Sequence, residues 1–238
     1  MKRIIAALVF CLTFFTLSQG FAKEKPRLGV LRFTNNTSAA WWSGTAGQDL
    51  QDMLAAELVT LKAFQVLERK ELDAVIGEQD LGASGRISKS TSSKIGKITG
   101  AKYLVAATVS AFEEGTSGTE GGLGFKGISL GGKKEKAYMA VDLKIIEVET
   151  GEIVDARTVE ATAKSGGLGG GLSVGGFSGN LAKHEKTPTG KAIRGCIMEI
   201  AEYLECSLVK GADDSCMADY KAKESKRREK TKGSVDLE

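Results

Sequence analysis

The chain has 238 residues, of which 42% are hydrophobic and 26% are charged, with a formal net charge of +3. These values are typical of a globular protein and exclude wholesale disorder. The small net charge gives no reason to expect nucleic-acid binding. His184 is the one histidine, so a metal site built from several histidines and a Ser-His-Asp triad are both disfavoured. We therefore expect a protein that is not an enzyme and that holds no metal.

The first 22 residues have the pattern of a cleaved export signal. A basic start is followed by an apolar run over residues 4–17, and small residues end at Ala22, after which cleavage is expected. The run is short for a transmembrane helix. A lipid anchor on Cys11 is the alternative, although Phe10 stands where such signals carry a small residue.

Export would place the remaining cysteines in an oxidising compartment, where disulfides form. Cys196 and Cys206 lie on one predicted helix, about 15 Å apart along its axis, which is beyond disulfide reach. Cys206 and Cys216 are a feasible pair because Gly211 allows the chain to turn back. Two or three buried thiols are the alternative to this bridge.

The first half of the exported chain alternates strands and helices. Strands are predicted from apolar runs at 28–33, 64–67 and 103–112. Helices are predicted from apolar spacing and caps at 48–61, 71–79 and 90–98. In the second helix, Leu72, Val75 and Ile76 are expected to face the core. This order of elements indicates an α/β fold.

The second half predicts a β-hairpin, a long helix and a tail. Residues 137–148 alternate apolar and polar side chains, and they pair with 152–163 across a short turn that contains glycine. Thr187 as N-cap and Pro188 in the first helical position begin a helix. Its buried stripe is expected to comprise Ala192, Ile193, Ile197, Ile200, Ala201 and Leu204. The segment 211–238 is polar and basic, and we expect it to be a disordered tail beyond a main domain at 23–210.

Sixteen of the 30 glycines fall into two segments that flank this hairpin. We call these segments the glycine windows: the first spans residues 113–136 and the second spans 160–183. Both contain spaced apolar residues, namely Leu123, Phe125, Ile128 and Leu130 in the first and Leu168, Leu172, Val174 and Phe177 in the second.

Two interpretations of the glycine windows are open. Glycine favours turns and flexible loops, and composition alone favours this interpretation. Alternatively, each window is a membrane β-hairpin, since two spanning strands need about 20 residues. Apolar side chains would then face lipid while glycine and serine face a lumen. Only a closed ring of subunits would satisfy the backbone of such hairpins in lipid.

Two phosphate-binding motifs are matched only superficially. Residues 122–127 fit G-x-G-x-x-G, but no strand–helix–strand unit surrounds them. Residues 127–134 imitate a P-loop, but Lys134 stands where a serine or threonine must contact magnesium. We expect no nucleotide and no other cofactor.

Six stretches of sequence, taken in order, carry a family resemblance. They are GVLRFTNN (29–36), DMLAAEL (52–58), FQVLER (64–69), LDAVIGEQDLGASG (72–85), IGKITGAKYLV (95–105) and VETGEIV (148–154). Together they resemble the CsgG family of curli secretion channel subunits, with a match from about Arg27 to Val209. An ordered set of this kind is more specific than any single motif.

The resemblance implies a periplasmic α/β domain with a mixed sheet and flanking helices, related to the N-terminal domain of TolB and to the lipoprotein LpoB. In family members that secrete curli, each subunit adds two hairpins to one outer-membrane β-barrel, at the places where this chain has its glycine windows. The implied function is a homo-oligomeric outer-membrane channel that passively exports an unfolded or fibre-forming polypeptide. The alternative is a soluble periplasmic adaptor that regulates envelope or peptidoglycan assembly.

The chain departs from this family in two places. Lys23 stands where curli channel subunits carry a lipidated cysteine. The loop between the first strand and the first helix forms the pore constriction in the channels. The corresponding segment here, residues 34–44, does not match that loop residue by residue. Its candidate lumen residues are Asn35, Asn36, Trp41 and Trp42. The alternative is that the two tryptophans pack on the core or on a neighbouring subunit.

Overall fold

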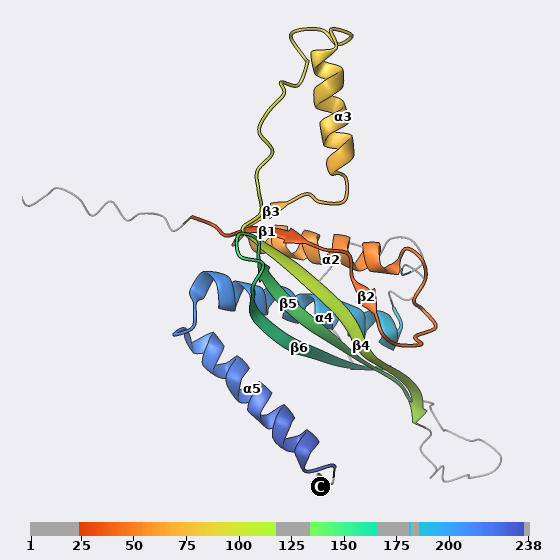
Figure 1. Ribbon diagram of the computed structural model, residues 1–238. Helices are drawn as coiled ribbons and strands as arrows, with labels where there is room; N and C mark the ends of the chain where they lie inside the picture. The colour runs from red at the N-terminus through yellow and green to blue at the C-terminus, as the bar shows by residue number, and fades with distance from the viewer. Residues whose placement is uncertain (1–23, 118–133, 166–180, 182–185, 236–238) are drawn as a thin grey trace, which may run out of the picture.

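The computed structural model describes residues 24–117, 134–165, 181 and 186–235 (Figure 1). The predicted signal segment therefore lies outside the described residues. In chain order the elements are β1 Arg27–Val30, β2 Thr34–Asn35, α2 Ala46–Leu61, β3 Gln65–Leu67, α3 Leu72–Ala83, β4 Tyr103–Ser117, β5 Lys134–Glu147, β6 Ile153–Lys164, α4 Pro188–Glu205, the π-helical turn η2 Cys206–Lys210 and α5 Ser215–Lys232.

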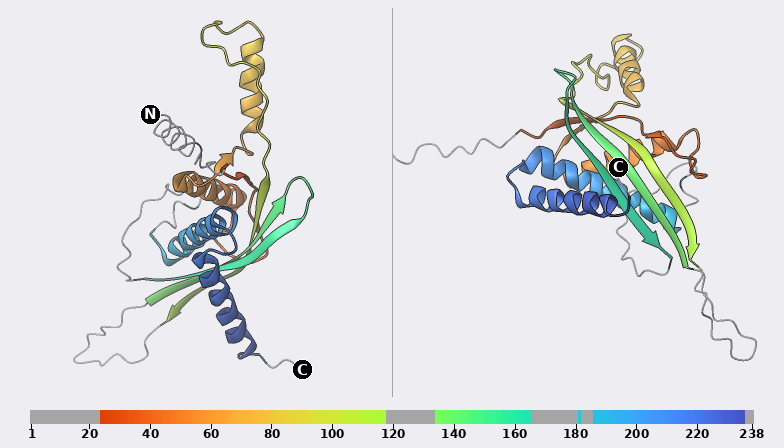
Figure 2. Two further views of the ribbon diagram at one scale, coloured as in Figure 1. Left: turned by 90° about the vertical axis from the view of Figure 1, so that its left-hand side faces the viewer. Right: turned by 60° about the horizontal axis from the view of Figure 1, so that its bottom comes forward.

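One mixed sheet organises the described part of the chain. Its strand order is β3-β1-β4-β5-β6, and the short β2 pairs with β4. β1 is parallel to β3 and β4, while β4, β5 and β6 form an antiparallel meander. α2 and α4 lie together on one face of the sheet (Figures 1 and 2). The prediction of a mixed α/β sheet with flanking helices is confirmed.

The core lies between β5 and α4. Every second residue of β5 is buried at Met139, Val141 and Leu143, whereas Lys144 is exposed, because successive side chains of a strand point to opposite faces. The residues of α4 that were predicted to face the core are all buried: Ala192, Ile193, Ile197, Ile200, Ala201 and Leu204. That stripe and the Thr187–Pro188 start of α4 are confirmed.

α2 packs close to the first strand and the chain that follows it. Its buried leucines are one turn apart, as at Leu50 and Leu54. The side-chain nitrogen of Gln51 donates a 2.8 Å hydrogen bond to the carbonyl oxygen of Val30. A Cβ atom at Gly47 would lie 2.4 Å from the carbonyl oxygen of Phe33. Glycine is therefore required there for the helix to approach the chain after β1.

Two expectations for residues 71–98 are wrong. α3 forms, but Val75 and Ile76 are 42% and 39% exposed and the helix has no buried residue. The helix points away from the sheet (Figure 1), so no second apolar surface lies opposite its apolar side chains. Residues 90–98 are not helical. The hydroxyl of Thr91 donates a 3.3 Å hydrogen bond to the carbonyl oxygen of Ser88, and such bonds from side chain to backbone compete with a helix.

The expected disordered tail differs from the structure, in which residues 215–232 form α5. The carboxylate of Asp214 caps this helix by accepting a 2.9 Å hydrogen bond from the backbone N–H of Cys216. Tyr220 is buried on the core side of the helix. Few apolar residues were needed, because a cap, one aromatic anchor and a cross-link position the helix.

Candidate functional site

The chain ends of both glycine windows meet at one end of the sheet. Ser117 pairs with Lys134, so the first window joins the neighbouring strands β4 and β5. Lys136 pairs with Lys164, so β6 ends, and the second window leaves the sheet, beside that point. We call this end of the sheet the window end.

The start of α4 brings the second window back to the window end. The hydroxyl of Thr187 caps α4 by accepting a 3.2 Å hydrogen bond from the N–H of Gly190. The buried Thr189 donates its hydroxyl hydrogen bond to the carboxylate of Glu114 on β4. The first turn of α4 is therefore held against β4, the strand that leads into the first window.

The β4–β5 pairing continues beyond the core. The ladder runs without interruption from the pair Glu113–Tyr138 to the pair Ser117–Lys134. Ala137 is the last buried residue of β5 toward this end, and Glu113, Gly115 and Glu135 are exposed. An antiparallel ribbon of β4 and β5, with β6 paired beside β5 as far as Lys164, therefore extends beyond the core and continues with its register set into the first window.

Charged groups at the base of this ribbon affect Tyr138. Burial raises the pKa of its phenol to about 12, with further contributions from the carboxylates of Glu160 and Glu113. Tyr138 therefore remains a neutral phenol at neutral pH and is a hydrogen-bonding group rather than a nucleophile.

The loop of residues 34–44, between the first strand and the first helix, begins along β4. Asn35 pairs with Val109 in the β2–β4 ladder. The side chain of Asn35 is closed onto its own loop: its oxygen accepts hydrogen bonds from the backbone N–H and the hydroxyl of Thr37, at 3.0 and 2.7 Å. Asn36 is exposed. Of the two asparagines, Asn36 is therefore the one whose side chain is exposed.

The two tryptophans of the loop differ in burial. Trp41 is 5% exposed and belongs to the core, and its ring lies 5.6 Å from that of Phe112 in an edge-on contact. Trp42 is half-buried and makes a similar contact with Trp41. Because Phe112 directly precedes the ribbon, this aromatic cluster supports the base of the window end. Trp41 occupies the packing role that was the alternative to a lumen position.

The eight apolar residues assigned to the glycine windows lie outside the described residues, as does His184. The first set is Leu123, Phe125, Ile128 and Leu130, and the second is Leu168, Leu172, Val174 and Phe177. The structure therefore describes the outer residues of the windows, at 113–117, 134–136 and 160–165, whereas residues 118–133 and 166–180 lie outside the described part of the chain.

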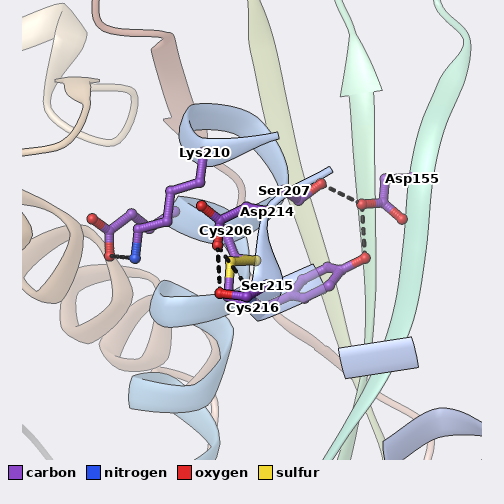
Figure 3. The surroundings of a disulfide bond; sticks show 9 residues. Asp155, Cys206, Ser207, Lys210, Asp214, Ser215 and Cys216 are labelled. Atoms are coloured by element: carbon purple, nitrogen blue, oxygen red, sulfur yellow. Dashed lines mark hydrogen bonds and ion pairs between the residues drawn. A yellow bond between two sulfur atoms is a disulfide. The ribbon is translucent and has the colours of Figure 1, made fainter. Parts of the chain in front are cut away.

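Cys206 and Cys216 form a disulfide with their Cα atoms 6.1 Å apart (Figure 3). It joins the end of α4 to the first turn of α5, and Gly211 adopts a positive φ of 98° between them. Cys196 is a free, buried thiol whose pKa burial raises to about 12. The disulfide reverses the chain so that α5 runs back along the sheet.

Polar contacts beside the disulfide connect β6 to the C-terminal helices, and no motif in the sequence predicts them. The carboxylate of Asp155 on β6 accepts hydrogen bonds from the hydroxyls of Tyr203 and Ser207, at 2.7 and 2.6 Å (Figure 3). The guanidinium of Arg157 lies over the rings of Tyr203 and Tyr220, 5.0 and 4.7 Å from their centroids. These partners are about 50 or more residues apart in the chain, and local spacing does not connect them.

A shallow hollow of about 770 Å³ lies at the opposite end of the sheet. Its lining includes Arg27 at the start of β1, Tyr103 at the start of β4 and Glu149 in the β5–β6 turn. In the described ranges, His, Cys, Asp and Glu side chains do not gather in groups of three or more that would suit a metal ion. No helix among the described residues combines the length and the apolarity that a membrane-crossing helix needs.

The sheet, its two covering helices and the window end define a mixed α/β domain that carries two insertions on one side. The chain belongs to the CsgG family: the model described as curli production assembly/transport component CsgG matches residues 13–235. This membership makes the chain an exported, envelope-associated module. A comparison with curated proteins gives no match.

Several solved structures are distantly similar. The hypothetical protein CT253 from Chlamydia trachomatis has 12% identity and a TM-score of 0.46, over 79% of this chain and 100% of that one. A PelC dodecamer from Paraburkholderia phytofirmans has 13% identity and a TM-score of 0.35, over 74% and 87%. A lipoprotein from Neisseria meningitidis has 12% identity and a TM-score of 0.33, over 62% and 89%. Likenesses this distant carry no conclusion about function.

Proposed function

We propose that this chain is one subunit of a homo-oligomeric outer-membrane secretion channel of the CsgG type, which passively exports an unfolded or fibre-forming polypeptide. The observation that carries the proposal is the meeting of both glycine windows at the window end. Two insertions that leave one end of a rigid sheet would enter the same membrane from the same side.

The paired ribbon supports this proposal. A β-hairpin in lipid needs every backbone group paired, because an unpaired N–H or C=O costs several kcal/mol there. The ladder from Glu113–Tyr138 to Ser117–Lys134 sets the antiparallel register in the outer residues of the window. Continuing that register through the window would produce a hairpin without a new nucleation step. The outer edges would pair with hairpins of neighbouring subunits, which makes a closed ring necessary.

The proposal requires no catalytic group and no cofactor, since an unfolded cargo would move down its own concentration gradient. In it, Asn36 is the candidate polar group of the constriction loop. Trp41 and Phe112 would hold that loop against the strand that leads to the membrane.

The test is an arginine scan of the first window with period two. If the register of the Ser117–Lys134 pair continues, the hairpin turns at residues 125–126, and Ile128 and Leu130 lie on its returning strand. In that hairpin Ile128 and Leu130 face lipid while Ser129 faces the lumen, since alternate residues point to opposite sides. Ile128→Arg and Leu130→Arg should each reduce stable insertion, and Leu130→Arg should do so more, because arginine on the lipid face costs about 2–4 kcal/mol at the bilayer midplane and less near the surfaces. Ser129→Arg is the matched control and should insert. The measurement is the amount of protein retained in carbonate-washed outer membranes.

The results separate a channel from an adaptor. If all three arginine variants remain in the membrane in equal amounts, or none does, the window has no lipid-facing side and the hairpin interpretation is wrong. If wild-type protein is released into the soluble periplasm, the adaptor function replaces the channel. Inserted wild-type protein should also conduct ions in planar bilayers, and Ser129→Arg should change that conductance.

A further inference from the structure

The last helix, α5, carries a large excess of positive charge. From Lys221 to Lys232 there are seven Lys or Arg and two Glu. The exposed basic side chains are Lys221, Lys223, Lys226, Arg228, Lys230 and Lys232. This density of charge is unusual for a chain with a net charge of only +3.

Some of these charges are matched within the structure. Glu224 pairs with Arg227 at 2.8 Å and with Arg228 at 3.2 Å, and the hydrogen bond from Arg227 lowers the pKa of its carboxyl. Lys223 pairs with Glu199 at 3.0 Å. Within the part of the chain that the structure describes, Lys221, Lys226, Lys230 and Lys232 have no ion-pair partner. Three of these four lysines lie in the C-terminal half of the helix.

α5 runs beside β6 toward the window end. The guanidinium of Arg157 donates a 3.1 Å hydrogen bond to the carbonyl oxygen of Tyr220, and Arg227 lies 3.9 Å from Glu160. Seven helical residues and three strand residues each advance about 10 Å. The two elements therefore run alongside each other in the same direction. Lys232, five residues further on, lies near the end of β6.

The figures agree with these contacts. In both Figure 1 and the left view of Figure 2, the C-terminal end of α5 and the ends of β4 and β5 lie at the same end of the molecule. α3 lies at the opposite end in both views. The C-terminal half of α5 therefore lies at the same end of the molecule as the points where the glycine windows leave the sheet.

We infer that the segment Lys226–Lys232 of α5 is a docking surface for anionic phospholipid headgroups. This inference rests on the proposed function, because inserted windows would bring a membrane surface to the window end. Each lysine near an anionic surface strengthens binding by about fivefold. The charge of α5 would thereby orient each subunit before or while its windows insert.

The chemistry of the helix favours a lipid surface over an acidic polypeptide. Its arginines, whose planar groups suit fixed carboxylate pairs, are used internally on Glu224. Its unmatched groups are lysines, which are flexible point charges that tolerate a fluid array of phosphates. The helix has no apolar face between Lys221 and Lys232, where Ala222 is the one apolar residue. It would therefore lie on headgroups without inserting, and its binding would weaken at high salt.

The experiment uses the purified full-length mature chain and vesicle flotation. Vesicles of phosphatidylcholine alone are compared with vesicles that also contain phosphatidylglycerol, at low and high salt. Wild-type protein should bind the anionic vesicles more tightly, and salt should reduce the difference. The triple variant Lys226→Gln, Lys230→Gln and Lys232→Gln should bind anionic vesicles at least about tenfold more weakly and neutral vesicles unchanged.

A matched control removes the same charge elsewhere. Lys89→Gln, Lys94→Gln and Lys97→Gln are exposed positions on the return segment after α3, at the opposite end of the molecule. This triple variant should bind as wild type does. Equal losses in both triple variants would show a general charge effect and would overturn the inference. An α5 variant that self-associates less but binds anionic vesicles normally would indicate a protein partner and would also overturn it.

The inference and the proposed function fail in different ways. If protein inserts equally into neutral and anionic vesicles, the windows enter membranes and the lipid contact of α5 is wrong. A different pair of results would support the lipid contact and contradict the channel. In it, a variant lacking residues 119–132 and 167–179 still binds anionic vesicles in a salt-sensitive manner, and a carbonate wash removes wild-type protein from the membrane.

Discussion

α3 and α5 both lie outside the core, but they are held in different ways. α3 contains the apolar residues Val75 and Ile76, and its contacts are made largely with its own return segment, as when the N–H of Gly96 donates to Gln79. α5 is much more polar, yet a disulfide, an arginine between two tyrosines and several ion pairs tie it to the domain. Apolar spacing therefore positions a helix only where a second apolar surface is within reach. A polar helix can be positioned by a few directional links.

The disulfide should give the largest effect in this comparison. The double variant Cys206→Ala and Cys216→Ala should lose about 2–3 kcal/mol of unfolding free energy, because a cross-link over ten residues restricts the unfolded chain. Urea unfolding measures the loss, and amide exchange should become faster in α5. Wild-type protein treated with a reductant should behave like the double variant, which itself should not respond to the reductant. An unchanged exchange rate in α5 would show that the bridge does not hold it.

Arg157 should give the next largest effect. Arg157→Met keeps much of the side-chain length but removes the cation above Tyr203 and Tyr220, and it should cost about 1–2 kcal/mol. Chemical unfolding monitored by tyrosine fluorescence measures this change. Lys144→Met is the control, because Lys144 is an exposed cation on the neighbouring strand. Equal costs for the two variants would mean that the stacked arrangement adds no stability.

Shortening the apolar residues of α3 should have little effect. Val75→Ala and Ile76→Ala should each change the unfolding free energy by no more than about 0.5 kcal/mol, since neither side chain is buried. Val59→Ala, at an exposed position of α2, is the matched control. If either α3 variant lost several times more than Val59→Ala at low protein concentration, α3 would have to pack on the domain.

The turn into α3 should give the smallest effect, and it should depend on pH. The carboxylate of Glu68 accepts hydrogen bonds from the backbone N–H groups of Arg69, Lys70 and Glu71, which lower its pKa below 4.5. A lowered pKa in the folded state means that the stabilisation is present above about pH 4.5 and is lost as the pH falls further. The protection of these three amides, measured as the intrinsic exchange rate divided by the observed rate, should therefore fall on acidification.

The Glu68→Gln variant supplies the control for that titration. Its amide cannot ionise, so the exchange rates of the three amides should follow the ordinary intrinsic pH dependence. An equal loss of protection in the variant and in the wild type would exclude the carboxylate as the cause.

The elements of the core were predictable from the sequence, while the outlying ones were not. In α4, a cap, a proline and an unbroken apolar stripe all indicate the same helix, and the stripe is buried as expected. In α3 the apolar spacing is equally clear, but the helix points away from the sheet. In α5 the polar composition indicated disorder. The spacing of residues within this segment gives no information about a contact with a distant residue such as Arg157.

The candidate site shows the same division. The glycine windows, their apolar residues and the Cys206–Cys216 pair are visible in the sequence. The sequence gives no sign that Thr189 binds Glu114, that Trp41 packs on Phe112, or that Lys164 lies beside Lys136. These are pairings of residues far apart in the chain.

By itself, the sequence determined the α/β class, the Thr187 cap of α4, the alternation of β5 and the stripe of α4, because each of these depends on the spacing of residues close together in the chain. Only the tertiary structure decided that both windows leave one end of the sheet and that α5 returns to that end beside β6. Strand order, register and the direction of a returning helix depend on contacts between distant residues. Local periodicity contains no information about which distant surfaces will meet.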